Sequence, residues 1–308
     1  MRPAGVRTPE LTIVLAVWRG PGALDEWLMA VEPQLDDDVE VLAVTEAGGI
    51  RDLPRRPWIE WIEAPTQTLV PHLWALGIER ARGRWVALAT SRLVPADDWL
   101  RRLRSVRRDV DVAAIGGAID PPPERASAQD WATFLLRYGA YLGRGDSEPR
   151  DLAGDNAAYR RSLLERQRKT WTQGFWEPEV HRRLADAGEK LRFVPEWRVR
   201  FAAGFGAGLF CRQRFSHGRR YGSDRLRGWR LPFRAFAALA LPLIPPILVW
   251  RVVHRAFEQD GIPSSAVLRS LPWLGLFATA WALGEVMGYL NPLKEAPLLT
   301  DSPISEMT

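Results

Sequence analysis

Short apolar runs alternate with helical periodicities along most of the chain. Apolar residues recur at helical spacing at Leu24, Trp27, Leu28 and Val31, for example. The apolar runs suit strands that are buried on both faces, and they lie at Leu11–Val17, Val39–Val44, Trp58–Ile62, Val86–Ala89, Val110–Ile115, Asn156–Tyr159 and Leu191–Val194. Because strand–helix–strand units give parallel sheets with right-handed crossovers, this pattern predicts an α/β domain with a mostly parallel, Rossmann-like sheet.

The segment Arg84–Leu100 is the clearest of these units. It joins a buried strand, a polar turn at Thr90-Ser91-Arg92 and the start of a helix near Pro95, where the Asp97-Asp98 pair supplies an N-cap. Open α/β sheets bind ligands at the carboxyl ends of their strands. We therefore expect any active site to lie at this turn.

Two apolar segments near the carboxyl terminus differ from the rest. Pro232–Val253 and Leu268–Leu290 approach the roughly 20 residues needed to cross a bilayer. Tryptophans near their ends suit interfacial anchors: Trp229, Trp250 and Trp273. We expect a hydrophobic helical hairpin; a pair of buried core helices is the alternative, and the prolines of the first segment allow it to be kinked or re-entrant. The expected domains are the α/β domain over residues 1–228, the membrane helices over 229–292 and a tail over 293–308.

Charge is concentrated just before these segments. Lys and Arg total 42 against 37 acids, a net charge of +5, but ten arginines and one acid, Asp224, lie between Arg198 and Arg234. Such a cluster favours an anionic partner: a phosphorylated ligand, anionic lipid or nucleic acid. The adjacent apolar segments argue against nucleic acid. By the positive-inside rule the cluster places the α/β domain on the cytoplasmic side of the cell membrane, while Arg251, Arg255 and Arg269 leave the hairpin topology open.

The cysteine count, the amino terminus and the glycine spacing argue against several other kinds of protein and site. The single cysteine, Cys211, excludes an intrachain disulfide and a multi-cysteine zinc site. No apolar run follows Met1, so no signal peptide is expected. Gly204, Gly206 and Gly208 miss the dinucleotide-binding fingerprint at its third glycine.

Several motifs in order resemble the family 2 glycosyltransferases with a GT-A fold, over about Leu11 to Tyr221. They are Gly77–Arg84 before the central strand, Pro95 with Trp99-Leu100 after it, Gly154–Arg161, and Phe175–Leu184 with Gly188 and Pro195. Ala16–Arg19 and Thr45–Gly48 stand where the family has the turns after its first two strands.

The resemblance implies transfer of a sugar from a nucleotide-sugar donor, with inversion. Glu177 aligns with the family's catalytic carboxylate and is the expected general base. The alternative is that Glu177 only stabilises the start of a helix through the helix dipole. Glu179 is the second candidate for the base. By the same resemblance, the acceptor site includes Asp155 and Asn156. Donor binding falls to Val17, Trp18, Glu46, Ser91, Arg92, Arg214, Arg219 and Arg220. The membrane segments suggest a lipid-linked or envelope glycan acceptor at the cytoplasmic membrane face.

The chain departs from this family at the polar turn. The family holds Mg²⁺ or Mn²⁺ with an Asp-x-Asp motif, whereas Thr90, Ser91 and Arg92 supply no anionic oxygen ligand. One interpretation is metal-independent transfer, with Arg92 providing the charge at the donor diphosphate. The other is that Arg92 is a surface charge on a site that has lost catalysis, leaving a membrane-anchored nucleotide- or glycan-binding protein. A membrane protein with an unrelated nucleotide-binding domain is a third possibility. No metal ligand is assigned, and Mg²⁺ or Mn²⁺ stays open as a cofactor.

Overall fold

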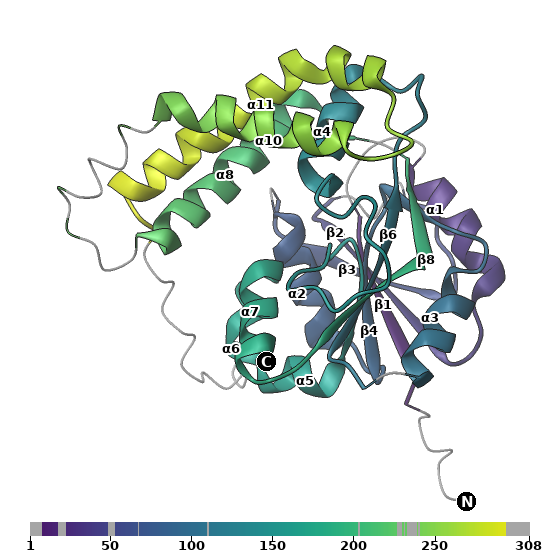
Figure 1. Cartoon of the computed structure of the whole chain (residues 1–308). Coiled ribbons are helices and arrows are strands. Elements are labelled where there is room, and N and C mark those ends of the chain that lie inside the picture. Colours follow the sequence, from purple (N-terminus) through teal and green to yellow (C-terminus); the bar gives the residue numbers. More distant parts are fainter. Residues whose placement is uncertain are drawn as a thin grey trace, which may run out of the picture. The chain divides into compact units, whose positions relative to one another are not determined.

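A computed structural model describes residues 8–17, 23–48, 53–66, 68–109, 111–202, 204–226, 230, 232, 239 and 241–293. The chain forms two compact units (Figure 1). The first comprises the residues up to Gly204 together with Arg255–Val267, and the second comprises Phe205–His254 and the residues from Leu268 onward. This division places the arginine-rich segment after Gly204 in the second unit, while the domain boundary at residue 228 stays a prediction.

An eight-stranded sheet forms the centre of the first unit, in the order β3-β2-β1-β4-β7-β6-β8-β5. The pairs along β3-β2-β1-β4 and the pair β6-β8 are parallel, while β7 runs antiparallel to both of its neighbours and β5 antiparallel to β8. The strands are β1 (Leu11–Ala16), β2 (Val39–Glu46), β3 (Ile59–Ala64), β4 (Trp85–Thr90), β5 (Leu93–Pro95), β6 (Ala114–Asp120), β7 (Asn156–Arg160) and β8 (Leu191–Phe201). The expected α/β class is confirmed, and the sheet is mixed, with four parallel and three antiparallel strand pairs.

Helices cover both faces of this sheet (Figure 1). On one face lie α1 (Ala23–Val31), the short η1 (Glu32–Gln34) and α3 (Trp99–Asp109). The other face is covered by α2 (Val70–Arg80), α5 (Arg161–Arg166), α6 (Arg168–Trp171) and α7 (Glu177–Asp186). The core on this second face is buried and apolar, with Trp74, Tyr159 and Phe175 among its largest side chains. Burial on both faces explains why the sequences of β1 and β4 are almost continuous apolar runs, whereas β3 and β8 have exposed positions between buried ones.

Two strands extend beyond the predicted ends, and each has a local cause. β8 continues seven residues past Val194 because a register shift between Gly117 and Ala118 of β6 leaves residues 195–197 unpaired, so Pro195 needs no ladder donor. β6 continues five residues past Ile115, to Asp120, because Ala118, Ile119 and Asp120 pair with β8. Apolar residues at helical spacing from Trp131 to Leu142 predict a helix over about 128–142, but α4 (Ala128–Tyr138) ends four residues earlier.

The second unit is built on two helices that approach closely. They are α8 (Ala207–Arg225) and α11 (Ser264–Leu290), whose first four residues belong to the first unit. A Cβ atom on Gly218 or Gly222 of α8, or on Gly284 or Gly288 of α11, would lie 2.0–2.3 Å from a backbone oxygen of the other helix. Glycines four residues apart on both helices are the packing pattern typical of membrane helix pairs.

The helix α11 has an apolar exposed face. Its exposed large side chains recur along one stripe, at Leu268, Leu276, Leu283, Met287 and Leu290. The hydroxyl of Thr279 on the same stripe is satisfied internally, because it donates to the Gly275 carbonyl at 2.8 Å. Glu285 is instead buried against α8, where it accepts hydrogen bonds from Trp281 at 3.0 Å and Arg225 at 3.2 Å.

Among the described residues, α11 is the one helix long and apolar enough to cross a membrane. Its 27 residues have a mean hydropathy of 1.3 over the most apolar window, and their length of about 40 Å exceeds a hydrocarbon core of roughly 30 Å. Of the first predicted segment, residues 233–238 and 240 lie outside the described residues; its described part contains η3 (Leu241–Leu243) and much of α10 (Ile244–Phe257), a helix of 14 residues. Pro245 and Pro246 suit a helix start, because proline lacks the N–H that would bond to a preceding turn. The predicted hairpin of two spanning helices is thus supported for one helix only.

Candidate active site

The carboxyl ends of β2, β1 and β4 meet at one edge of the sheet. Ala16 of β1 lies beside Val44 on one side and Thr90 on the other. The next residue, Val17, continues the ladder through its N–H to the Val44 carbonyl at 2.8 Å. Glu46 ends β2, and its Oε1 is buried without a hydrogen-bond partner among the described residues. The edge therefore offers one unsatisfied acceptor; Trp18, also predicted to bind the donor, lies outside the described residues.

The polar turn after β4 is buried. Thr90, Ser91 and Arg92 are 3%, 1% and 8% exposed, respectively. The guanidinium of Arg92 donates to the Gly204 carbonyl. Burial lowers the pKa of Arg92 to about 10, and the charge of Arg137 acts in the same direction. The interpretation of Arg92 as a surface charge is therefore wrong, because its side chain is enclosed by protein.

Asp155 stands opposite Thr90 on the antiparallel neighbour of β4. The register pairs Ala89 with Asn156, which places the residue before β7 at the carboxyl end of β4. The Thr90 hydroxyl donates to Oδ1 of Asp155 at 3.3 Å, and Arg137 Nη2 donates to Oδ2 at 2.8 Å. Asp155 is 4% exposed. Both of its carboxylate oxygens are thus engaged inside the protein.

Asn156 has a different environment from its neighbour. It is fully buried, its Oδ1 accepts from the Trp99 indole at 2.9 Å, and its Nδ2 donates to the carbonyls of Ala118 and Trp197, each at 3.1 Å. These bonds join β7 to α3 and to the neighbouring strands. The Asn156 side chain therefore holds neighbouring elements together next to Asp155. Its contact with an acceptor stays a prediction.

Glu177 is the first residue of α7 and packs against the backbone beside Asp155. A Cβ on Gly154 would lie 2.9 Å from Oε1 of Glu177, so this glycine leaves room for the carboxylate. Burial and, after it, the nearby charge of Asp155 raise the pKa of Glu177 to about 7. The helix N–H and the charge of Arg137 oppose this rise. We call these three residues, Glu177, Asp155 and Arg137, the carboxylate–arginine cluster.

Arg137 is the member that sequence reasoning missed. It lies on α4, and its side chain is 15% exposed. Burial by itself would lower the pKa of this guanidinium, but the charge and hydrogen bond of Asp155, together with Tyr138 and Glu177, outweigh burial and raise the pKa above its ordinary value. The one signal in the sequence is an arginine directly before a buried tyrosine in an otherwise apolar helical face; its partner, 18 residues further on, leaves no local pattern.

A buried network fixes the helix that carries Glu177. His181, one turn further along α7, is 1% exposed and lies within hydrogen-bonding distance of the Tyr159 hydroxyl, at 2.8 Å. Its other ring nitrogen contacts Asp151, which also accepts from Tyr141 at 3.1 Å. Burial alone would raise the pKa of Asp151, but the His181 contact outweighs it and lowers that pKa. The network ties α7 to β7 and to the loop before it.

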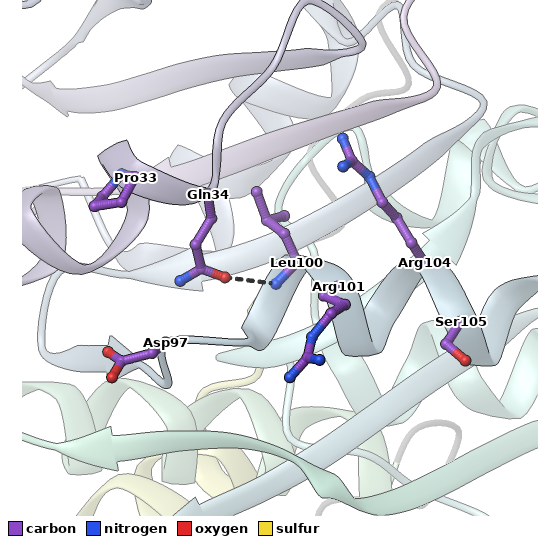
Figure 2. A pocket seen from close by; sticks show the side chains of 7 residues that line it. All are labelled: Pro33, Gln34, Asp97, Leu100, Arg101, Arg104 and Ser105. Atoms are coloured by element: carbon purple, nitrogen blue, oxygen red, sulfur yellow. Dashed lines mark hydrogen bonds between the residues drawn. The ribbon is translucent and has the colours of Figure 1, made fainter.

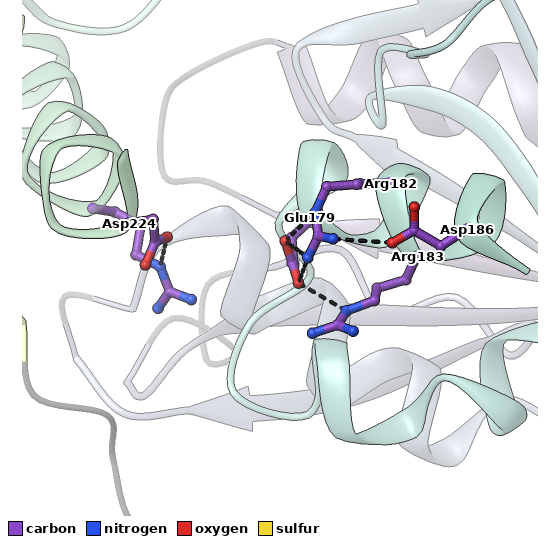
Figure 3. A network of polar contacts seen from close by, with 6 residues as sticks. Glu179, Arg182, Arg183, Asp186 and Asp224 are labelled. Carbon is purple, nitrogen blue, oxygen red and sulfur yellow. Dashed lines mark hydrogen bonds and ion pairs between the residues drawn. The ribbon is translucent and has the colours of Figure 1, made fainter. Parts of the chain in front are cut away.

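Glu179, the fallback base, lies on the outer face of the same helix. Figure 3 shows its carboxylate between Arg182 and Arg183, at 2.7 Å and 3.1 Å. Its side chain is 35% exposed, and Arg182 also pairs with Asp186. Glu179 therefore has the contacts of a solvated surface ion pair, and Glu177 remains the better candidate.

The three arginines predicted to close over the donor lie on α8, in the second unit. Arg214 stacks over the Trp281 ring at 4.3 Å. Arg220 pairs with Asp224 at 2.9 Å (Figure 3). The backbone of Arg219 packs against Gly288. Their roles at the donor stay predictions.

A surface hollow of about 620 Å³ lies elsewhere, between η1 and the start of α3 (Figure 2). None of its lining residues was predicted to bind donor or acceptor. In it the Gln34 amide accepts from the N–H of Leu100 at 2.9 Å, so a glutamine from outside the helix satisfies an orphan donor at the start of α3. Asp98 instead pairs with Arg101 and Arg102, so the expected aspartate N-cap is replaced.

The residues at the strand edge do not fit a divalent metal. Within the described parts of the chain, no three His, Cys, Asp or Glu side chains converge on a common point. Mg²⁺ and Mn²⁺ prefer several carboxylate or carbonyl oxygens, and here a guanidinium occupies the space beside the carboxylates.

Comparison with known proteins gives a likeness in structure only. No protein-family model matches the chain, and no curated protein sequence matches it. Among solved structures, it is similar to the mannosyltransferase PcManGT from Pyrobaculum calidifontis in complex with GDP-Man and Mn²⁺. The TM-score is 0.54 at 17% identity, covering 91% of this chain and 88% of that one. At this identity the likeness shows that the chain has a glycosyltransferase fold.

Proposed function

We propose that this chain is a glycosyltransferase of the family 2, GT-A type, with Glu177 as its general base. The observation that carries the proposal is a partly buried carboxylate of pKa about 7, placed beside the carboxyl edge of a glycosyltransferase-fold sheet. A base with a pKa near neutrality combines a deprotonated fraction with useful basicity.

In the proposed step the acceptor hydroxyl oxygen attacks the anomeric carbon while the bond from that carbon to the donor phosphate oxygen breaks. Glu177 takes the hydroxyl proton, and the nucleoside diphosphate leaves with the bonding electrons. One base and direct attack give inversion. Asp155, with Asn156 behind it, would border the acceptor; because Asp155 is held by Thr90 and Arg137, its orientation is fixed.

Donor binding would use the neighbouring strand ends. The unsatisfied oxygen of Glu46 is suited to accept a hydrogen bond from a ribose hydroxyl or a base N–H, with Val17, Trp18 and Ser91 beside the nucleotide. Arg92 would stabilise the leaving diphosphate, which needs fixed positive charge where its own charge develops. Transfer would then be independent of a metal. By resemblance to the family, Arg214, Arg219 and Arg220 would add phosphate contacts.

We further propose that the protein acts at the cytoplasmic face of the cell membrane on a lipid-linked or envelope glycan acceptor. The apolar stripe of α11 and the internally satisfied Thr279 and Glu285 support lipid contact, because an uncompensated polar group in hydrocarbon costs several kcal/mol. The arginines of α8 suit an anionic membrane surface, at about 1 kcal/mol for each charge.

The alternative is a membrane-anchored protein that binds a nucleotide or glycan without turnover. The absence of carboxylates at Thr90-Ser91-Arg92 is the observation that favours it. The two functions differ in turnover and not in binding, so binding data alone do not separate them.

The test is nucleotide release from a panel of sugar nucleotides, with the full chain in nanodiscs, with and without EDTA. We expect release with one donor, unchanged by EDTA and lost in Glu177→Gln. Glu179→Gln is the matched control, since it removes the same charge two residues away on the solvent face. Binding without release from any donor would establish the alternative, and strict metal dependence would refute the role of Arg92.

A further inference from the structure

Two carboxylates and one guanidinium share a buried space at the carboxyl edge of β4. Glu177 packs against Gly154, the residue before Asp155, where a Cβ would lie 2.9 Å from its Oε1. After burial, the charge of Asp155 is the next cause of the raised pKa of Glu177. Arg137 contacts Asp155 at 2.8 Å, and its charge also acts on Glu177. Like charges held together in a low-dielectric interior are tolerated only with a counter-charge. Arg137 provides that counter-charge.

Without Arg137, the same atoms would be a set of oxygen ligands. The Asp155 carboxylate, the Glu177 carboxylate and the Thr90 hydroxyl are all hard oxygen donors, the kind that Mg²⁺ and Mn²⁺ prefer. In the protein, however, Oδ2 of Asp155 accepts from Arg137 and Oδ1 accepts from Thr90. A metal ion would have to displace a bonded guanidinium and would also meet its positive charge.

The position of Arg137 is fixed by its own helix. Its Nε donates to the Tyr138 hydroxyl at 3.1 Å, and its guanidinium lies 5.4 Å from the centre of that ring. Tyr138 is 4% exposed and packs against Phe201 of β8, with ring centres 6.2 Å apart. Ser127 caps the start of α4 by accepting from the Asp130 N–H. A guanidinium anchored in this way is a permanent part of the site.

We propose that Arg137 is the resident cation of this site: it neutralises Asp155 and Glu177, excludes divalent metal ions, and acts with Arg92 in place of a metal. Two guanidinium groups carry the same total charge as one divalent ion. The consequence for donor phosphate rests on the proposed function, whereas the exclusion of metal does not. It follows that removing the charge of Arg137 converts the two carboxylates into a metal site.

The experiment is Mn²⁺ titration of the full chain in nanodiscs, followed by the electron paramagnetic resonance signal of free Mn²⁺. Wild-type protein is expected to bind no Mn²⁺ at this site. Arg137→Gln is expected to bind one Mn²⁺, with an affinity at least about tenfold above the weakest that the titration detects, because a unit charge a few ångströms away is removed. Adding Asp155→Asn to that variant should abolish the new site.

Two controls separate this effect from a general change of charge. Arg160→Gln removes the same charge from a pair with Asp111, whose side chain is 94% exposed, and should leave Mn²⁺ binding unchanged. Arg137→Lys keeps the positive charge and should also bind no Mn²⁺. Thermal melts show whether each variant is folded.

Two results would overturn the inference. One is a wild-type Mn²⁺ site that disappears in Asp155→Asn, an outcome that does not depend on whether Arg137→Gln folds. The other is a folded Arg137→Gln protein that binds no more Mn²⁺ than Arg160→Gln. Binding of GDP and UDP in EDTA is measured in parallel. Failure of wild type to bind either nucleotide would refute the proposed function and leave the Mn²⁺ result to decide the role of Arg137.

Discussion

Replacing Glu177 with Gln should stabilise the protein above neutral pH while removing its activity. Glu177 has a pKa of about 7 in the folded chain against an ordinary value of 4.5. Between these values the folded protein holds a proton that the unfolded chain has released. The free energy of unfolding therefore falls as pH rises from about 4.5 to about 7 and stays low above it. Glutamine carries no charge at any pH and lacks this loss.

The size of the effect follows from the shift. A rise in pKa from 4.5 to about 7 corresponds to about 3 kcal/mol at most, since each unit is worth about 1.4 kcal/mol and the side chain retains some exposure to water. At pH 5 the wild type is largely protonated, so wild type and Glu177→Gln should have similar stability. At pH 8 the variant should be more stable by on the order of 2–3 kcal/mol.

The assay is urea unfolding at pH 5, 6, 7 and 8, with wild type, Glu177→Gln and Glu179→Gln under identical detergent conditions. Glu179→Gln breaks a surface ion pair and should lose up to about 1 kcal/mol, with no gain at high pH. The reasoning fails if Glu177→Gln gains no stability relative to wild type between pH 5 and pH 8. It also fails if both variants show the same pH dependence.

Three further outcomes are expected. Gly154→Ala places a Cβ 2.9 Å from the Glu177 carboxylate and should lower kcat in the nucleotide-release assay about 10- to 100-fold with a smaller change in KM; an unchanged kcat would mean that the carboxylate position is not critical. Asp155→Asn removes a charge that raises the pKa of Glu177, so the acid limb of the pH–kcat/KM profile, near pH 7 in wild type, should move to lower pH; a move upward would contradict the electrostatic assignment. Gly284→Leu should separate α8 from α11 and lower stability by about 2 kcal/mol or more in thermal melts, whereas the exposed Leu283→Ala should have little effect; equal effects would refute glycine packing.

The sequence predicts the strands and their carboxyl edge well because both depend on local patterns. The apolar runs mark β1, β2 and β4, and the break at Thr90 marks where β4 ends. Prediction is poorer where the environment of a residue depends on neighbours that are distant in the sequence. Gly116 of β6, for example, is needed because the Leu152 side chain fills the space where its Cβ would be, and Leu152 lies far away in the sequence.

Charged residues at the site were predicted with uneven success for the same reason. Glu177 was identified through resemblance to a family motif, but its raised pKa depends on burial and on Asp155, which no local spacing reveals. The sequence allows Arg92 to be either a group that binds the donor diphosphate or a surface charge. Its burial excludes the surface charge and leaves the donor role a prediction. Arg137 carries no motif at all, because its ion pair joins α4 to the residue before β7.

The missing carboxylates of the turn and the ion pair beside it are best understood as one feature. A turn that kept an acidic residue at position 90 would add a third negative charge next to Asp155 and Glu177, which one guanidinium does not balance. With Thr90 there instead, its hydroxyl donates to Asp155, and Arg137 with Arg92 leaves the site close to neutral or positive. Such a site can accept an anionic diphosphate without first recruiting a cation. The lack of carboxylates at the turn, compared with the family that the sequence resembles, therefore does not by itself imply lost catalysis. Arg137, which only the folded structure brings beside Asp155, supplies positive charge at the same place.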